Sequence, residues 1–242
     1  MSDVTALAPI LSGRGDDHVR FCREIEVRRA EHDASRRRHG ITMERIFVQT
    51  LPEAAVALTH LQGPGADSLL VDLAVSLDAY DRWFLAQIEW LHGIDVRVRV
   101  PPAPDLVRSI VTDAPVNGKS FACAVPLAHE NLEDWKAFQR LVISRRVEQR
   151  AMLERMGVAK ETVHLAPTRL GLYALLYYEG IDRLAGSPLW TSEHPFARWY
   201  VGNLDSLHGI DFARFAAHLD VTLRLEWRLG AAPATQVAVP RF

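Results

Sequence analysis

Apolar residues along this chain follow two periods. In some segments they alternate with polar residues, which is typical of strands, and in others they recur every third or fourth position, which is typical of helices. In residues 1–100 they predict the order strand, helix, strand, strand, helix, strand. The predicted strands cover 4–11, 44–50, 54–62 and 96–100. The first helix begins near Asp16 and ends at Gly40, and the second carries Tyr80 on its apolar stripe and ends at Gly93.

The same order of elements returns in the second part of the chain. Strands are predicted at 121–127, 162–166, 172–178 and 221–227, and helices at 131–156 and 195–208. Residues 212–219 have the pattern of an inserted helical turn or two. This insertion puts the last strand of the second part later than its counterpart in the first.

Short motifs repeat together with the elements. The tetrapeptide His-Gly-Ile-Asp stands at 92–95 and again at 208–211, each time preceded by an Arg-Trp pair. Upstream, Arg-Arg-x-Glu at 28–31 returns at 145–148. Because the spacing of the two sets differs by only one residue, the pattern predicts a tandem repeat with a single loop deletion.

Each copy is much longer than the roughly 20–50 residues of a solenoid or propeller unit, so each is expected to have its own core. The predicted domains are 1–100 and 120–229. A linker at 101–119, which opens with Pro-Pro-Ala-Pro, joins them, and residues 230–242 form a tail.

The predicted fold class is α+β. The order βαββαβ is typical of a ferredoxin-like domain, an antiparallel four-stranded sheet with both helices on one face. The other face of such a sheet is apolar and has to be covered. Two tandem ferredoxin-like domains can cover each other, and we therefore expect a pseudo-dimeric antiparallel α+β barrel within one chain.

Residues 28–42, together with the Arg-Trp and His-Gly-Ile-Asp motifs, resemble a bacterial family of the dimeric α+β barrel superfamily. The resemblance covers about 16–100 and 130–212. That superfamily includes antibiotic-biosynthesis monooxygenases, polyketide cyclases, haem-degrading monooxygenases and dabb-type stress-responsive proteins. It implies the barrel fold and a small-molecule site between sheet and helices, but not a reaction, because this fold hosts many chemistries.

Composition narrows the class of protein further. Of the 242 residues 48% are hydrophobic and 24% charged, and the net charge of −2 argues against a nucleic-acid-binding surface. Cys22 and Cys123 lack metal-like spacing and are expected to be buried thiols. No signal-peptide pattern and no apolar run of membrane-spanning length is present, so the sequence predicts a cytoplasmic protein without a membrane partner.

The repeated Arg-Arg-x-Glu motif places an arginine and a glutamate on one helix stripe in each copy, Arg28 with Glu31 and Arg145 with Glu148. The stripe is shared with apolar residues and is expected to face the sheet. In a structural interpretation each pair tethers the corner at Asp95 or Asp211, and Glu148→Gln is then strongly destabilising. In a functional interpretation the charges line a ligand cavity.

His92 and His208 are predicted in the last turn of a helix, where histidine stabilises free carbonyls and the helix dipole. The superfamily resemblance offers a second interpretation. Its haem-degrading members carry a tryptophan and, about ten residues later, an axial histidine on this helix, which resembles Trp83 with His92 and Trp199 with His208. Neither first strand supplies the asparagine that those enzymes carry, which speaks against haem.

The second copy is richer in groups that can move protons. His164, Tyr173 and Tyr177 stand where the first copy has Phe47, Val56 and His60. Histidine can act as a general base near neutral pH, and tyrosine can donate to a developing enolate or phenolate. These groups equally suit hydrogen bonding within a core, so both interpretations stay open.

We therefore expect a small-molecule enzyme of secondary metabolism that performs cofactor-free oxygenation or proton-transfer-driven cyclisation of an apolar or aromatic metabolite. The candidate catalytic residues are His164, Tyr173, Tyr177 and His208, and the candidate substrate-binding residues are Arg145, Glu148, Tyr178, Trp190 and Trp199. Phosphate-loop, nucleophile-elbow and zinc patterns are absent, so no organic cofactor and no metal is expected.

Two alternatives remain at the level of sequence. One is a non-catalytic barrel that binds a ligand or a protein partner, and the other is a haem-binding or haem-degrading monooxygenase. Besides a small-molecule substrate, a second copy of the chain is the partner that the barrel fold leaves open, as a homodimer.

Overall fold

A computed structural model of the protein describes residues 2–51 and 54–231. The first part contains β1 (Ser2–Ile10), α1 (Gly15–Val27), α2 (Arg29–Arg38), β2 (Met43–Thr50), β3 (Ala55–Gly63), α3 (Leu69–Val75), α4 (Ala79–His92) and β4 (Asp105–Val111). The second part contains β5 (Ser120–Leu127), the short 3-10 helix η1 (His129–Asn131), α5 (Leu132–Ser144), α6 (Arg146–Arg155), β6 (Lys160–Thr168), β7 (Gly171–Glu179), α7 (Pro195–His208), α8 (Phe212–His218) and β8 (Asp220–Arg228).

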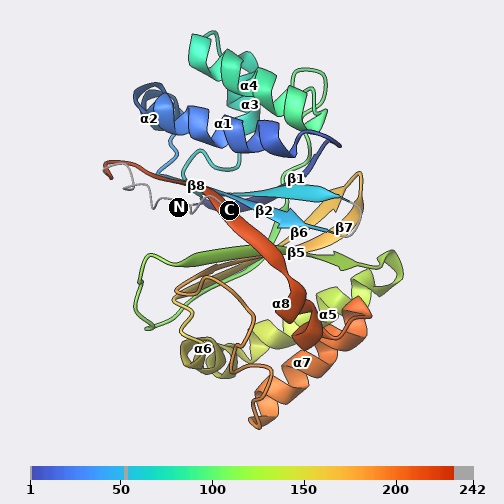
Figure 1. Ribbon diagram of the computed structural model, residues 1–242. Coiled ribbons are helices and arrows are strands. Elements are labelled where there is room, and N and C mark those ends of the chain that lie inside the picture. The colour runs from blue at the N-terminus through green and yellow to red at the C-terminus, as the bar shows by residue number, and fades with distance from the viewer. Residues whose placement is uncertain (1, 52–53, 232–242) are drawn as a thin grey trace, which may run out of the picture.

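The strands form two four-stranded antiparallel sheets that face each other. Their orders are β1-β3-β2-β8 and β4-β6-β7-β5. Figure 1 shows the sheets in the middle of the molecule, with α1 to α4 outside the first sheet and α5 to α8 outside the second. The fold therefore matches two tandem ferredoxin-like domains packed sheet to sheet, which confirms the predicted fold class.

The two halves exchange their last strands. β4 follows the first half in sequence but pairs with β6 in the second sheet, and β8 follows the second half but pairs with β2 in the first sheet. In Figure 1 β8 leads from α8 to the opposite sheet. Each sheet consequently depends on a strand from the other half of the sequence.

The prediction of a strand at 96–100 is wrong. The Asp95 carboxylate accepts hydrogen bonds from the backbone N–H groups of Arg97 and Val98, and the Arg99 N–H bonds back to the Asp95 carbonyl, so this segment is a turn. Its alternating valines and arginines do not pair with any described strand. The fourth strand is β4, which lies inside the segment predicted as the linker.

Other element boundaries differ in smaller ways. The first long helix of each half breaks after about half its length, at Arg28 and at Arg145, so that α1 and α2, and likewise α5 and α6, are separate helices. α3 was not predicted, whereas α8 is the predicted inserted helix. Gly93 and Gly209 end α4 and α7 in the left-handed conformation, with φ of 63° and 65°, as the sequence predicts.

The apolar core has three layers. One lies between each sheet and its helices, and the third lies between the sheets. The buried apolar residues of this third layer are Met43, Phe47, Leu58, Ala122, Ala124, Ala166, Tyr173, Leu175 and Tyr177. Cys22 and Cys123 are buried free thiols in the two outer layers, as expected. Among the described residues, no helix has both the length and the hydropathy to cross a membrane.

The strand exchange predicts that neither half folds well alone. Residues 1–118 retain β4 without its partner β6 and leave the β2 edge without β8, so we expect a self-associating or insoluble fragment. Size-exclusion chromatography measures this, and co-expression with residues 119–242 should restore a complex of one copy of each. A stable, monomeric fragment would contradict the exchange.

Candidate functional site

A small internal pocket lies between the second sheet and the helices α5, α7 and α8. It encloses about 10 Å³, which is room for about one water-sized molecule. Trp135 and Gln139 reach it from successive turns of α5, because residues four apart share a helix face. The lining is Arg108, Trp135, Gln139, Val163, Ala174, Leu176, Tyr200, Leu204, His208 and Phe212.

Arg108 on β4 is the buried cation of this pocket. Its Nε donates to a Glu161 carboxylate oxygen at 3.0 Å and its Nη2 to the Tyr200 hydroxyl at 2.6 Å, while Nη1 donates to the Gln139 side-chain oxygen. The same Glu161 oxygen accepts from the Gln149 side chain at 2.8 Å. Burial alone lowers the pKa of Arg108, but Glu161 and Tyr200 outweigh it, so the guanidinium stays charged.

Several hydrogen-bond donors in the pocket remain without an acceptor. Trp135 is buried, and its indole Nε1–H has no partner among the described residues. Since the Tyr200 oxygen accepts from Arg108, the hydroxyl hydrogen is free to donate. Burial raises the pKa of Tyr200 to about 12 and keeps it protonated. Donors of this kind can stabilise an oxygen atom that gains negative charge.

A second, open groove lies on the same face of β6 and β7 as this pocket. It has a volume of about 560 Å³ and is lined by Asp105, Leu127, His129, Leu132, Lys136, Leu165, Pro167, Thr168, Gly171 and Leu172. Leu165 in the groove lies two positions along β6 from Val163 in the pocket, and Leu172 lies two positions along β7 from Ala174. Because residues two apart share a face of a strand, groove and pocket lie next to each other along the helix-facing side of the second sheet.

The corresponding positions of the first half carry different groups. His18 and Cys22 on α1 stand 117 positions before Trp135 and Gln139, and Phe84 on α4 stands 116 before Tyr200. The His18 Nδ1 lies 3.9 Å from the Cys22 sulfur, and burial lowers the pKa of His18 to about 4. The first half therefore lacks the glutamine and the tyrosine that meet in the second.

The first half has a buried ion pair of its own. The Arg36 Nε on α2 donates to a Glu44 carboxylate oxygen on β2 at 2.5 Å, and the His32 Nε2 lies 3.3 Å from the same oxygen. Burial alone raises the pKa of Glu44, but Arg36 and His32 outweigh it and hold that pKa at about 2. Glu44 and Glu161 occupy matched strand positions, yet a helix supplies the arginine to one and an exchanged strand supplies it to the other.

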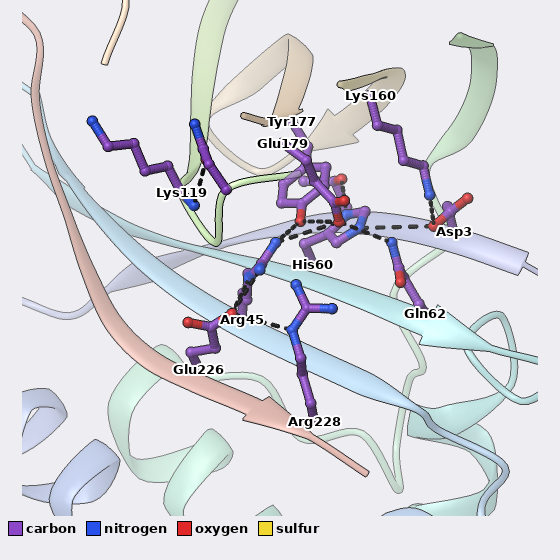
Figure 2. Close-up of polar contacts among 12 residues, drawn as sticks. Asp3, Arg45, His60, Gln62, Lys119, Lys160, Tyr177, Glu179, Glu226 and Arg228 are labelled. Carbon is purple, nitrogen blue, oxygen red and sulfur yellow. Dashed lines mark hydrogen bonds and ion pairs between the residues drawn. The ribbon is translucent and has the colours of Figure 1, made fainter. Parts of the chain in front are cut away.

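Three of the four predicted catalytic residues lie in a different layer. His164, Tyr173 and Tyr177 face the space between the two sheets and are buried there. Figure 2 shows Tyr177 beside His60, with its hydroxyl bonded to Glu179 at 2.9 Å and to Arg45. Neither the pocket nor the groove is lined by any of the three, and their catalytic role stays a prediction.

The predicted substrate-binding residues are also spread out. Arg145 bonds Glu148 at 2.6 and 2.9 Å, as predicted, but both side chains are partly exposed instead of facing the sheet. Trp199 packs under the Arg145 guanidinium at 4.6 Å. Trp190 lies in the segment between β7 and α7, where its indole N–H donates to the Leu184 carbonyl at 2.8 Å. Tyr178 lies near the Arg108 cluster on the helix-facing side of β7.

The expected tether from the arginine-glutamate pairs to the His-Gly-Ile-Asp corner is wrong. Asp95 caps the turn that follows it, and Asp211 accepts from the backbone N–H of Arg214 at the start of α8. Both carboxylates thus serve local backbone groups. Because each arginine-glutamate pair is partly exposed, water solvates its charges on one side. The pair therefore does not require a further bond to the aspartate of the corner.

His92 and His208 hold a helix to the first strand of their own half. The His92 Nδ1 donates to the Pro9 carbonyl at 2.7 Å, and the His208 Nδ1 donates to the Pro126 carbonyl at 2.7 Å. The bond goes to a neighbouring strand and not to the helix itself. Because Nδ1 carries the hydrogen, the Nε2 of His208 is left as a lone pair, and this residue lines the pocket.

The surroundings of His208 do not fit a haem. The pocket beside it holds about one water-sized molecule, and Trp135, Tyr200 and Phe212 close it off. A macrocycle would require these side chains to leave the core. Within the described part of the chain there is also no cluster of three or more histidine, cysteine or acidic residues that could hold a metal ion.

Sequence reasoning missed Arg108, Trp135, Gln139 and Tyr200. Trp135 and Gln139 share the inner stripe of α5 with Phe138 and Val142, and this stripe was visible in the sequence. Arg108 was not recognisable, since its strand lies in the predicted linker and pairs with a sheet whose other strands come later in the chain.

No family model and no curated protein matches this sequence. Three solved structures resemble its fold. A "putative monooxygenase" from Lactobacillus acidophilus is 13% identical, covering 96% of this chain and 99% of its own, with a TM-score of 0.49. A "putative monooxygenase" from Fusobacterium nucleatum is 11% identical over 97% of both chains, with a TM-score of 0.47. An "anthrone oxidase-like protein" is 9% identical over 98% of both chains, with a TM-score of 0.45.

Two glutamates on the same half give a matched stability prediction. Glu161→Gln leaves the buried Arg108 without its counter-charge and should lower the free energy of unfolding by about 3–5 kcal/mol. Glu148→Gln should leave it nearly unchanged, because that side chain is partly exposed to water. Urea unfolding followed by circular dichroism measures both. Equal losses would show that the surface pair also contributes to the fold.

Proposed function

We propose that the protein is an enzyme of the monooxygenase or cyclase type that acts on a small apolar or aromatic molecule without an organic cofactor. The substrate would lie in the gap between α5, α7 and the second sheet, with its apolar body in the groove. An acidic hydroxyl or carbonyl oxygen of the substrate would reach the inner pocket. The three solved structures that resemble the fold have monooxygenase or oxidase names.

The observation that carries this proposal is a buried cation with free donors in a small pocket that lies next to an open groove on the same face of the second sheet. Arg108 has two N–H groups without an acceptor among the described residues, and Trp135 has one. A neutral, well-packed core gains no stability from such unpaired donors. They would become paired if a substrate oxygen bound between them, most strongly if that oxygen carried negative charge.

His208 is the residue best placed to take a proton. Its Nε2 lone pair is set by the Nδ1 bond to Pro126, and burial lowers the pKa of the imidazole, so it is neutral near pH 7. The side chain is partly exposed, which gives an accepted proton a route to solvent. Tyr200 and Arg108 would stabilise the resulting phenolate or enolate. Such an electron-rich anion can then react with dioxygen or close a ring.

Oxygen uptake with a panel of hydroxynaphthalenes and hydroxyanthracenes tests the proposal. For any compound that is turned over, His208→Asn and Tyr200→Phe should each lower kcat by about 10²–10⁴, the usual effect of a positioned acid, base or oxyanion donor. His92→Asn is the matched control, because His92 makes the same bond to the first strand in the other half.

Equal losses of kcat in the His92 and His208 variants would show that His208 has a structural role only. If His164→Ala or Tyr177→Phe abolished turnover while the Tyr200 variant kept it, the site would lie between the sheets instead. Binding of these compounds without turnover would favour the non-catalytic barrel.

A further inference from the structure

Two buried histidines lie near Asp3 in the layer between the sheets, outside the proposed active site. His60 on β3 and His164 on β6 are both fully buried. The His60 ring stacks on the Tyr177 ring with centroids 3.4 Å apart and an angle of 8°, and its Nδ1 lies 2.9 Å from the Thr5 hydroxyl. Figure 2 shows His60 between Asp3, Tyr177 and Glu179, where the two sheets meet.

Each of these imidazoles has a hydrogen-bond partner on only one of its two ring nitrogens. The His164 Nε2 donates to the Asp3 carbonyl at 3.0 Å, and because a carbonyl can only accept, the Nδ1 of His164 is a lone pair. That Nδ1 has no partner among the described residues, and neither has the Nε2 of His60. Both rings are therefore held as neutral imidazoles, each with a nitrogen at which a further proton would find no acceptor in hydrogen-bonding distance.

The charged groups around the pair are already matched to each other. The Lys160 ammonium bonds the Asp3 carboxylate at 2.7 Å, and that carboxylate lies 3.8 Å from the His60 Nε2. Arg45 pairs with Glu226 at 2.6 Å and with Glu179 at 3.4 Å. The ionisable and polar groups that face the two histidines are, by element, Asp3 and Thr5 of β1, Arg45 of β2, Gln62 of β3, Lys160 and Thr162 of β6, Tyr177 and Glu179 of β7, and Asp67 before α3.

A proton on either histidine would add a positive charge to a layer whose carboxylates are already paired. Burial lowers the pKa of His60 well below its ordinary value, and Lys160, His164 and Arg45 lower it further. Burial also lowers the pKa of His164, although the bond to the Asp3 carbonyl and the charges of Asp3 and Asp67 oppose this. Since both folded-state values lie below that of an exposed histidine, their contribution to stability is full above about pH 6.5 and is lost as the pH falls.

The polar ties between the sheets are gathered at the same end. His164 and Lys160 both hold Asp3, Gln62 donates to Glu179 at 3.4 Å, and Arg45 reaches Tyr177 and Glu179. At the other end the sheets are joined by Gln49, whose side chain makes two bonds to the backbone of Ala124, at 2.7 and 3.0 Å. His164 is therefore one of the ties at the Asp3 end, and His60 lies beside them.

We propose that His60 and His164 form an acid-sensitive latch between the two sheets, which opens at the Asp3 end when the imidazoles are protonated. The helices stay on their own sheets during this opening, because their contacts lie in the two outer layers. Opening gives solvent access to the space between β1, β3, β6 and β7, while the Gln49 end holds the sheets together.

Native-state hydrogen exchange at pH 7, 6 and 5, corrected for the intrinsic exchange rate, tests the latch. The opening constant of β1, β3 and β6 should rise by up to about 100-fold per pH unit below pH 6, tenfold for each histidine that gains a proton on opening. Amides of α5 and α7 should change much less. Uniform loss of protection in strands and helices would overturn the proposal, since it would indicate global unfolding.

Variants separate this effect from the other buried histidines. His60→Phe keeps a ring against Tyr177, and His164→Leu removes the second imidazole, so the double variant should lose the pH response of the strands. His18→Leu is the control, because His18 lies under α1 in an outer layer, and it should keep that response. A double variant with unchanged pH dependence would overturn the latch. If the double variant does not fold, each single variant should show half the logarithmic slope.

Discussion

The pairing of β4 with β6 and of β8 with β2 is the constraint on which the rest of this structure depends. A four-stranded sheet with helices on one face leaves the other face bare, and the two halves solve this by facing each other. Exchange of the last strands adds backbone hydrogen bonds between the halves to this packing. The halves are thus joined by sheet edges as well as by an apolar layer, and the core of that layer is covered from both sides.

Because both faces of each sheet are covered, each half has to accommodate polar side chains in two buried layers. In the outer layers Glu44 and Glu161 each neutralise an arginine, which reaches one of them from α2 and the other from β4. A buried ion pair contributes little net stability compared with an apolar pair of equal volume. In the second half the arginine of this pair lines the small pocket, whereas the pair in the first half lies within an aromatic cluster.

The two halves show how one arrangement of elements can hold different chemistry. Matched bonds from His92 to Pro9 and from His208 to Pro126 keep the same helix on the same strand in both. Around this shared frame, His18, Cys22 and Phe84 are replaced by Trp135, Gln139 and Tyr200. The frame therefore depends on the repeated motif, and the difference between the halves depends on a few side chains that point into the gap between helix and sheet.

Most of the strands, the ends of α4 and α7 at Gly93 and Gly209, and the face-to-face sheets could be predicted from the sequence, because periodicity and glycine conformation act locally. Alternation along β6 and β7 separates His164 and Tyr177 from Glu161 and Tyr178, but it does not say which set faces the helices. Because both faces are buried, both sets of residues follow the same apolar pattern in the sequence. Only the pairing of distant strands decides which face lines the pocket. The same pairing brings Arg108 to the pocket, from a strand that follows the first half in sequence.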